Sequence, residues 1–497
     1  MNRSYQRGAD PNSRYGVARS FAVVSIAVLF ATAGLCIAAQ REGGRQAASS
    51  PAATISKEQA ATLVDEFQTT LRQRWSYYPY SAAEIDAAIA ALREQIGPDT
   101  SFGALALEFQ KVIAHGIDGH ARVSGWRLDG GYLPFLIESS GDRFVACTAM
   151  RTKFLAEDHP FIVSIDGRPI ADWLAGARQL VAKGSPDYVK SHALRQLRRI
   201  DHWRGEMGLP QGGPLEVVLS SRDGSRTTKV SLPVAGNPPA TSDGPPRLSR
   251  VLPDNIGFLR LESMNSAAVA EIKNWMPQFR ATEGLVVDVR DNGGGSRDAL
   301  RELFSYLMAE NDPPRVINCA KYRLHASFRD DHLISRFLYP ATSERWTNRE
   351  REAITQFRES FRPAWELPVD EFSDWHYMVL SRLDVPEIYH YSKPVVVLLN
   401  ARCFSATDVF LAGLKGWRNV TLLGTPSGGG SARIVPARLA NSPISVALGS
   451  MVSFMPNGLS FDGNGVEPDI RVEPSPEYFI GGTDNALERA REIIRDK

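Results

Sequence analysis

The sequence predicts a mixed α/β protein built from several folded units, and three observations support that class. Its 497 residues exceed the length of one typical domain. Hydrophobic residues make up 43% and charged residues 23%, an ordinary globular composition that argues against a mostly disordered chain. From Leu248 onward, apolar or β-branched runs alternate with segments of helical spacing. This alternation predicts a layered α/β core.

The N-terminus predicts export. Four arginines within residues 1–19 precede an uncharged run at 20–39. One interpretation is a cleaved signal peptide, with Ala31-Thr32-Ala33 as the small-residue cleavage site. The other is an uncleaved membrane anchor, because about 18 apolar residues can span a bilayer. Both place the rest of the chain in the periplasm or outside the cell, tethered by the small polar residues 40–56.

Two domains are predicted before the core. Residues 57–129 have helical periodicity, with Leu63, Phe67 and Leu71 recurring at four-residue spacing. Residues 130–235 have a shorter period and predict a β-rich domain, which the polar linker 236–247 ends. Its expected strands are 132–138, 143–148, 160–165, 215–220 and 227–233.

Residues 248–497 form the predicted core. Continuous apolar runs suit parallel strands that are covered on both faces. The expected strands are 256–261, 284–289, 394–400 and 419–424, and the expected helices 296–308 and 407–417. A charged, aromatic-rich insertion at 311–391 interrupts this pattern, and we expect it to cover or border the functional site.

Charge and cysteine content exclude several classes of function. Lys plus Arg number 57 and Asp plus Glu 56, whereas nucleic-acid-binding proteins favour a basic excess. Four cysteines exclude a disulfide scaffold and a multi-Cys zinc module. Without residues 1–39, Cys147, Cys319 and Cys403 remain, and the sequence does not choose a pair for the one disulfide that they allow. We expect no nucleic-acid partner, no metal and no organic cofactor.

Two residues are candidates for nucleophilic chemistry. Ser405 follows an apolar strand and begins a predicted helix, where the helix dipole favours an oxyanion. The alternative is that Ser405 only caps the helix. His120 lies in a Gly/Asp turn that enters an apolar stretch, although many such histidines are structural. His115 and His120 lack metalloprotease spacing, and the glycine-rich turns match neither the Rossmann nor the Walker pattern.

Four segments in this order resemble the carboxy-terminal processing and tricorn-type serine peptidases. They are DVRDNGGG at 288–295, NARCFSATD at 400–408, GTPSGGGS at 424–431 and NGVEPDI at 464–470. The resemblance covers roughly residues 57–480. It implies a crotonase-like α/β core, an N-terminal helical domain, and a PDZ-like domain at 130–235.

The resemblance also implies roles for particular residues. Ser405 would be the nucleophile, with an oxyanion hole formed by the N–H groups of Ala406 and of Gly294 or Gly295. Processing proteases use a lysine base in a G-K-G turn, but the corresponding turn at 427–431 has no lysine.

The base is therefore expected from the tricorn-type branch, which implies His120 in the turn Asp118-Gly119-His120-Ala121. Asp462 would orient the imidazole, with Glu467 as the alternative acid. Lys415, on the helix that follows Ser405, is expected to face away from the helix start.

The sequence thus predicts an exported serine peptidase that works through an acyl-enzyme, with C-terminal or tail-specific processing of peptides or proteins. The tricorn pattern has an acid after the nucleophile, and here that residue is Ala406. We therefore expect apolar rather than basic P1 residues. Two alternatives stay open: a non-hydrolytic binder of hydrophobic ligands with the same fold, and an esterase.

Overall fold

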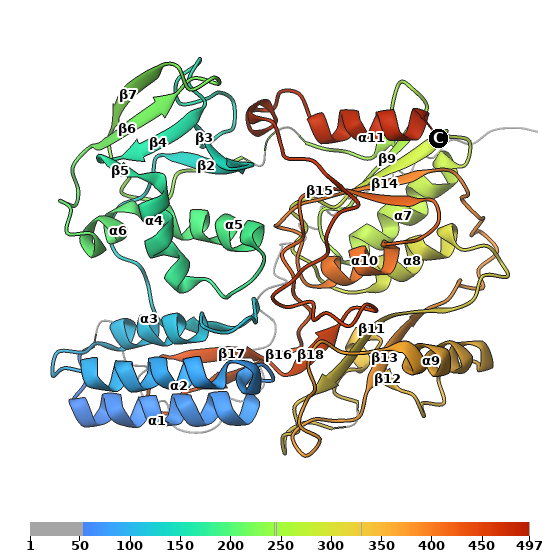
Figure 1. Cartoon of the computed structure of the whole chain (residues 1–497), viewed down its shortest axis with the longest axis horizontal. Helices are drawn as coiled ribbons and strands as arrows, with labels where there is room; N and C mark the ends of the chain where they lie inside the picture. The colour runs from blue at the N-terminus through green and yellow to red at the C-terminus, as the bar shows by residue number, and fades with distance from the viewer. Residues whose placement is uncertain (1–52, 243, 245, 330, 497) are drawn as a thin grey trace, which may run out of the picture. The chain divides into compact units, whose positions relative to one another are not determined.

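The computed structural model describes residues 53–242, 244, 246–329 and 331–496 as a mixed α/β protein (Figure 1). The predicted export segment, 1–39, and most of the tether at 40–56 lie outside these residues. Within the described residues, no helix combines the length and apolarity needed to cross a membrane. The cysteines of this part, Cys147, Cys319 and Cys403, are buried and form no disulfide.

Three N-terminal helices begin the described chain. They are α1 (Lys57–Arg74), α2 (Tyr78–Gln95) and α3 (Phe102–Ile113). Ser56 and Gln59 form a capping box at the start of α1, and Phe67 of α1 stacks on Phe109 of α3 with ring centroids 4.0 Å apart.

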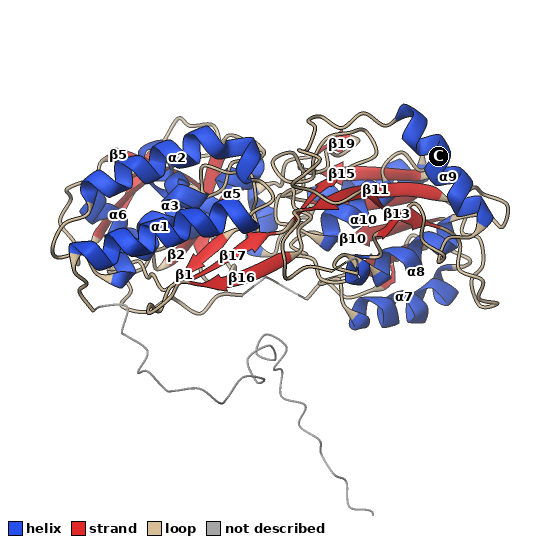
Figure 2. Ribbon diagram, turned by 90° about the horizontal axis from the view of Figure 1, so that it is seen from below, coloured by secondary structure: helices blue, strands red, loops and turns tan. Residues whose placement is uncertain are grey.

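Strands from both ends of the chain complete this helical part. β1 (Arg122–Ser124), β17 (Ser445–Gly449) and β16 (Ile434–Arg438) form an antiparallel sheet beside the helices (Figure 2). The β1–β17 pair brings the His120 turn, which immediately precedes β1, against the C-terminal part of the chain.

The predicted β-rich segment forms a sheet in the order β2-β3-β4-β6-β7, with β5 paired to β4. The strands are β2 (Phe135–Ser140), β3 (Arg143–Thr148), β4 (Phe161–Ile165), β5 (Arg168–Pro169), β6 (Leu215–Ser220) and β7 (Thr227–Leu232). It also contains three helices that the sequence analysis did not predict: α4 (Ile170–Ala177), α5 (Pro186–Leu197) and α6 (Ile200–Glu206). β2 is an edge strand and packs against α5.

The core sheet has the order β19-β15-β14-β10-β9-β8 and is parallel except for β8. Its strands are β8 (Arg250–Val251), β9 (Ile256–Arg260), β10 (Gly284–Asp288), β14 (Val395–Leu399), β15 (Val420–Gly424) and β19 (Ile470–Arg471). The four central strands lie where the sequence predicted them. This sheet sets the carboxyl ends of β10 and β14 side by side.

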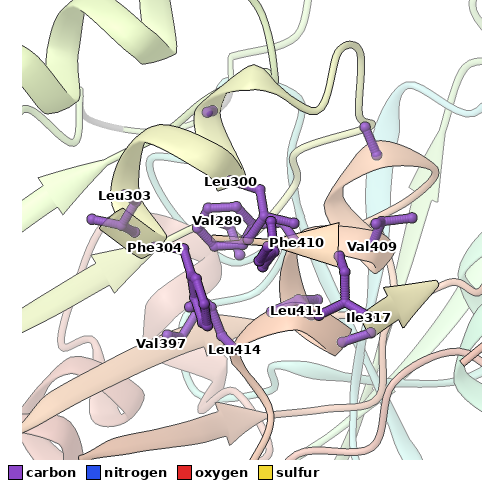
Figure 3. Packing of buried hydrophobic residues seen from close by; sticks show 14 of the residues in the cluster. Val289, Leu300, Leu303, Phe304, Ile317, Val397, Val409, Phe410, Leu411 and Leu414 are labelled. Carbon is purple, nitrogen blue, oxygen red and sulfur yellow. The ribbon is translucent and has the colours of Figure 1, made fainter. Parts of the chain in front are cut away.

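Helices cover both faces of this sheet. α7 (Ser266–Phe279), α8 (Asp298–Leu307) and α10 (Ala406–Leu414) pack on one face, and α11 (Asn485–Arg495) packs on the other (Figure 1). Alternate residues of one strand divide between them: Val397 joins the first cluster, and Val396 and Leu398 join the second. In Figure 3, Phe410 of α10 lies beside Leu300 of α8 and Val289. Helix α10, which follows the candidate nucleophile Ser405, is therefore anchored deep in the core.

The predicted insertion at 311–391 folds onto the core rather than standing apart. β11 (Arg315–Tyr322), β12 (Tyr339–Pro340) and β13 (His376–Leu380) form an antiparallel sheet with β18 (Met451–Phe454), which α9 (Asn348–Ser360) covers. Short 3₁₀ helices occur at Arg178–Leu180, Ile334–Arg336 and Pro476–Ile480. The division of the chain into domains at the boundaries given above stays a prediction.

Candidate active site

Ser405 lies between β14 and α10, at the N-terminus of a helix buried in the core. Its φ is 62°, in the left-handed region that non-glycine residues seldom occupy. Such a conformation costs about 1–3 kcal/mol and persists only where the surroundings enforce it. Ser405 occupies the N-cap position, yet its side chain makes no capping hydrogen bond within the described part of the chain. The half-buried hydroxyl is thus held at a helix start without serving as a cap.

Buried polar side chains hold the serine loop against the glycine-rich loop after β10. The Asn292 Oδ1 accepts from the Thr407 hydroxyl at 2.7 Å and from the Gly294 N–H at 2.9 Å. The Asn292 carbonyl accepts from the Phe404 N–H at 3.0 Å. Asn400 Nδ2 donates to Asp291 Oδ1 at 2.8 Å. These bonds join the two loops into one rigid unit.

The predicted oxyanion-hole residues meet at this junction. A methyl group on Gly294 would lie 2.7 Å from the Ser405 Cβ and 2.9 Å from the Ala406 nitrogen, so only glycine fits there. The Gly294 N–H is already bonded to Asn292. Among the described residues, the N–H groups of Gly295 and Ala406 have no hydrogen-bond acceptor. Gly295 and Ala406 are therefore the better pair of donors for an oxyanion.

His120 lies beside the serine loop. Its ring packs on Phe404, the residue before Ser405, with centroids 4.5 Å apart. A methyl group on Gly430 would lie 2.8 Å from the His120 Cε1. No hydrogen bond joins His120 and Ser405 among the described residues, but catalytic hydrogen bonds often tighten only with substrate bound. The structure thus brings together the base and nucleophile candidates with three glycine-rich loops.

Two buried carboxylates face the imidazole. The His120 Nδ1 lies 3.9 Å from Asp462 Oδ1 and 3.9 Å from Asp118 Oδ1. The other predicted acid, Glu467, has an exposed side chain, and its carbonyl accepts from Lys415 Nζ at 2.7 Å. Lys415 also pairs with Asp469. Asp462 and Asp118 are therefore the acids positioned to orient His120.

The surroundings of these carboxylates differ. Asp462 Oδ2 accepts from the Tyr77 hydroxyl at 2.6 Å and from the Ser431 N–H at 3.1 Å, which leaves Oδ1 buried and unpaired. The Asp118 carboxylate accepts from Trp75 Nε1 at 2.8 Å and from the N–H groups of His120 and Gly449, each at 2.9 Å. Burial and the charge of Asp462 raise the pKa of Asp118. Asp462 has the freer oxygen for His120.

Three residues of the site were missed by the sequence analysis. Asp118 lies in the same Asp-Gly-His turn, so that motif could have identified it. Tyr77 of the N-terminal helical part is fully buried, and burial with the nearby Asp462 and Asp118 carboxylates raises its pKa well above the ordinary value. Tyr188 of α5 places its hydroxyl 2.8 Å from where a methyl group on Gly119 would lie. No local pattern marks either tyrosine.

Asp408 holds the third glycine-rich loop. Its carboxylate accepts from the Ser427 hydroxyl at 2.5 Å, the Gly429 N–H at 3.0 Å and the Gly430 N–H at 3.1 Å. Burial raises the pKa of Asp408 to about 8, and these hydrogen bonds oppose that rise. Because Gly430 lies against His120, Asp408 links helix α10 to the candidate base.

One further chemistry fits part of this cluster. Ligand atoms of Asp118, His120 and Asp462 lie within 4.8 Å of one another, so the three could hold a cation. Buried donors, including Tyr77 and Trp75, stabilise the ionised form of both carboxylates. That environment suits an imidazole that becomes positively charged during a reaction.

A cleft of about 920 Å³ reaches the serine loop, although its lining includes neither Ser405 nor His120. Residues of β2 and α5 line one part, including Glu138 and Arg195, and Asn400–Arg402 of the serine loop line another. The Arg402 guanidinium pairs with Glu138 at 3.1 Å and with Asp291 at 2.7 Å. The cleft therefore connects the edge strand β2 to the segment that carries Ser405.

Comparison with known sequences finds similarity to proteases in part of the chain. Residues 255–472 match the model of peptidase family S41. A carboxy-terminal-processing protease of Bartonella bacilliformis is 35% identical over 91 residues, which are 18% of this chain and 20% of the relative. A tricorn protease of Thermoplasma volcanium is 31% identical over 102 residues, 20% of this chain and 10% of that protein. The matches thus span a fifth or less of the relatives' own lengths.

Solved structures share the fold. The crystal structure of mature CPAF aligns with a TM-score of 0.61 at 16% identity, covering 88% of this chain and 97% of that one. The same protein complexed with lactacystin also aligns at 0.61, with 17% identity over 88% of this chain and 98% of that chain. The predicted resemblance to the carboxy-terminal processing and tricorn-type peptidases is confirmed by the family match over residues 255–472 and by these two relatives.

Proposed function

We propose that the chain is a serine peptidase in which Ser405 is the nucleophile, His120 the general base and Asp462 the acid that orients it. One observation carries the proposal. Ser405 has a strained conformation at a helix start, while the neighbouring imidazole faces two buried carboxylates. That combination supplies a nucleophile, a base and an orienting group.

The reaction would proceed through an acyl-enzyme. His120 Nε2 takes the hydroxyl proton as the Ser405 Oγ attacks the scissile carbonyl, and the N–H groups of Gly295 and Ala406 stabilise the oxyanion. The imidazolium then donates its proton to the departing amine. Water then attacks the acyl-enzyme while His120 takes its proton. The imidazolium returns that proton to the Ser405 Oγ, and the carboxylic acid product is released. Throughout, the Nδ1–H faces Asp462 Oδ1, and a small ring movement from 3.9 Å would form that hydrogen bond.

A fluorophosphonate probe tests the nucleophile. We expect covalent labelling of Ser405 in the wild-type protein and none in Ser405→Ala, whose thermal stability should stay nearly unchanged because the half-buried hydroxyl packs little. Labelling with no hydrolysis of peptides but turnover of simple esters would indicate the esterase instead. Absence of labelling would favour the hydrophobic-ligand binder.

We further propose that the PDZ-like segment, 130–235, captures the C-terminal tail of substrates. The edge strand β2 and the adjoining helix α5 support this, since a peptide can add a strand to such an edge. Amidating the C-terminus of a good peptide substrate should raise KM and leave kcat nearly unchanged. An unchanged KM would remove C-terminal capture from the proposal.

The P1 preference is proposed to be apolar. No acid follows the nucleophile, and the half-buried Phe404 ring lies beside His120. Ala406 itself is only 4% exposed and belongs to the core cluster, so its side chain does not touch the substrate. It affects the P1 preference only because it provides no negative charge. A P1-scanning peptide library checks this. Preference for Lys or Arg would contradict it.

Export is proposed from residues 1–39 alone. Cell fractionation of the full chain should place the protein in the periplasm, in the membrane or in the medium. N-terminal sequencing would distinguish cleavage near 31–33 from a retained anchor. Recovery of an intact chain from the cytoplasm would contradict export.

A further inference from the structure

Three arginines gather beside the candidate active site without acidic partners. They are Arg297, two residues after Gly295; Arg336, in the insertion; and Arg433, two residues after Ser431. In the part of the chain that the structure describes, none of them forms an ion pair with a carboxylate. This is unusual here, because the arginines of the neighbouring cleft, such as Arg402 and Arg290, pair with acids.

Hydrogen bonds bring the three segments together. Arg297 donates to the Arg336 carbonyl at 2.8 Å and to the Ser431 hydroxyl at 3.0 Å. Arg433 donates to the hydroxyl of Ser335 at 2.9 Å, and Arg336 donates to the Gly295 carbonyl at 3.4 Å. The cluster therefore contacts both the oxyanion loop, through Gly295, and the loop beside His120, through Ser431.

No carboxylate of the described residues compensates the charges of this cluster, although Arg297 also donates to Asn318 Oδ1 at 3.1 Å. Arg297 is 3% exposed, and burial, with a smaller contribution from Arg336, lowers its pKa to about 9. The Nε atoms of Arg336 and Arg433 are buried and have no hydrogen-bond partner among the described residues. Burying a guanidinium without an anion costs several kcal/mol. Arg336 and Arg433 are half-buried, and an anion beside their guanidinium groups would compensate this positive charge.

We propose that Arg297, Arg336 and Arg433 form a subsite for a carboxylate of the substrate close to the scissile bond. The proposal rests on the proposed peptidase function, because the cluster adjoins Gly295 and the Ser431 loop. Guanidinium groups pair with carboxylates through geometrically matched hydrogen bonds. The carboxylate can come from an Asp or Glu side chain or from the C-terminus of the peptide. It also gives the insertion, which contributes Arg336, a role in substrate selection.

Binding to the inactive Ser405→Ala protein tests the subsite separately from catalysis. The probe is a fluorescein-labelled eight-residue peptide library, with Glu, Gln, Asp or Asn at each position and the C-terminus free or amidated. We expect one position at which an acid binds about 10-fold more tightly than its amide. A preference that follows the free C-terminus instead identifies the terminal carboxylate as the ligand.

Arg336→Gln and Arg433→Gln, each in the Ser405→Ala background, should reduce that preference to less than about 2-fold. Arg358→Gln is the matched control, because Arg358 is an exposed arginine of α9 in the same insertion, and it should keep the full preference. Far-ultraviolet circular dichroism checks that each variant is folded. If the two glutamine variants do not fold, Arg297→Lys replaces them as the test. It keeps a positive charge, so it should lower the preference for an acid without abolishing it.

Two results would overturn the proposal: no position that favours an acid, or an acid preference that survives both glutamine substitutions. Failure of the wild-type protein to hydrolyse any peptide would count against the peptidase function alone. The acid preference in binding would still be measured in that case. Different results would therefore contradict the carboxylate subsite and the catalytic assignment.

Discussion

Replacing Tyr77 with phenylalanine tests whether the Tyr77 hydroxyl holds Asp462, the proposed orienting acid, in place. The Tyr77 hydroxyl is buried and donates to Asp462 Oδ2 at 2.6 Å. The substitution removes one of the two hydrogen bonds that hold this carboxylate, and the Ser431 N–H alone remains. Ring packing is unchanged, so no cavity forms. The effect should therefore come from the lost hydrogen bond.

The expected magnitude follows from burial. A hydrogen bond to a charged group contributes about 1.5–3 kcal/mol, and we expect a similar loss in the free energy of unfolding. A freed Asp462 carboxylate would orient His120 less well. Because misplacement of a catalytic group by about 1 Å can cost on the order of 100-fold, we expect the rate of fluorophosphonate labelling to fall about 10- to 100-fold.

The adjacent tyrosine supplies the control. The Tyr78 hydroxyl donates to Asp86 at 2.8 Å, but the Asp86 side chain is 37% exposed, and the other described side chains that bond this pair, Arg72 and Gln68, lie outside the candidate site. Tyr78→Phe should cost about 1 kcal/mol or less and leave labelling unchanged. Urea unfolding and labelling kinetics measure both variants. Equal labelling rates for Tyr77→Phe and the wild type would refute the argument that Tyr77 supports the base through Asp462.

Three further substitutions have definite expected results. His120→Ala should slow labelling of Ser405 by several powers of ten, because nucleophile and base act as one unit; a fall of less than 10-fold would contradict this. Asp462→Asn should slow labelling more than Asp118→Asn, since Asp462 Oδ1 is unpaired while the Asp118 carboxylate already has three donors; the reverse order would identify Asp118 as the orienting acid. Burial raises the pKa of Asp408 from 3.8 to about 8, so the folded protein holds this proton more tightly than the unfolded chain, and the stability from Asp408 should decline as pH rises from about 4 to about 8. The difference in unfolding free energy between the wild type and Asp408→Asn should therefore decrease over that range, and a constant difference in urea unfolding would count against it.

The core strands were predictable because burial on both faces leaves an unambiguous pattern. Val395–Leu399 is apolar at every position, and every residue of β14 is buried. Helix α5 shows the opposite case. Ser185 caps it and Pro186 occupies its first turn, but only part of its length is buried, so its apolar stripe is short. The strand-like alternation in the flanking segments led the sequence analysis to predict only strands in this region, so the helix was missed.

The site was predictable only where its residues belong to local motifs. Ser405, His120 and the glycines lie in short segments whose order is distinctive, and Asp118 shares the His120 turn. Tyr77 reaches the site through packing between segments that are hundreds of residues apart in the sequence. Arg336 reaches it from the insertion. Their positions depend on tertiary contacts, which hydrophobic periodicity does not encode.

The same long-range contacts explain how His120, the proposed base, is held in place although it is far from Ser405 in the sequence. Ser76, next to Tyr77, donates from its hydroxyl to the carbonyls of Gly449 at 2.8 Å and Met451 at 3.0 Å. The Asp118 carboxylate bonds the Gly449 N–H, which fixes the His120 turn to the same strand end. Asp462 follows strands β17 and β18 in the chain, and its carboxylate accepts from the Tyr77 hydroxyl. Because each of these bonds is buried, a shift of the N-terminal helices would disturb base and acid together, so the active site depends on the helical part as much as on the core that carries Ser405.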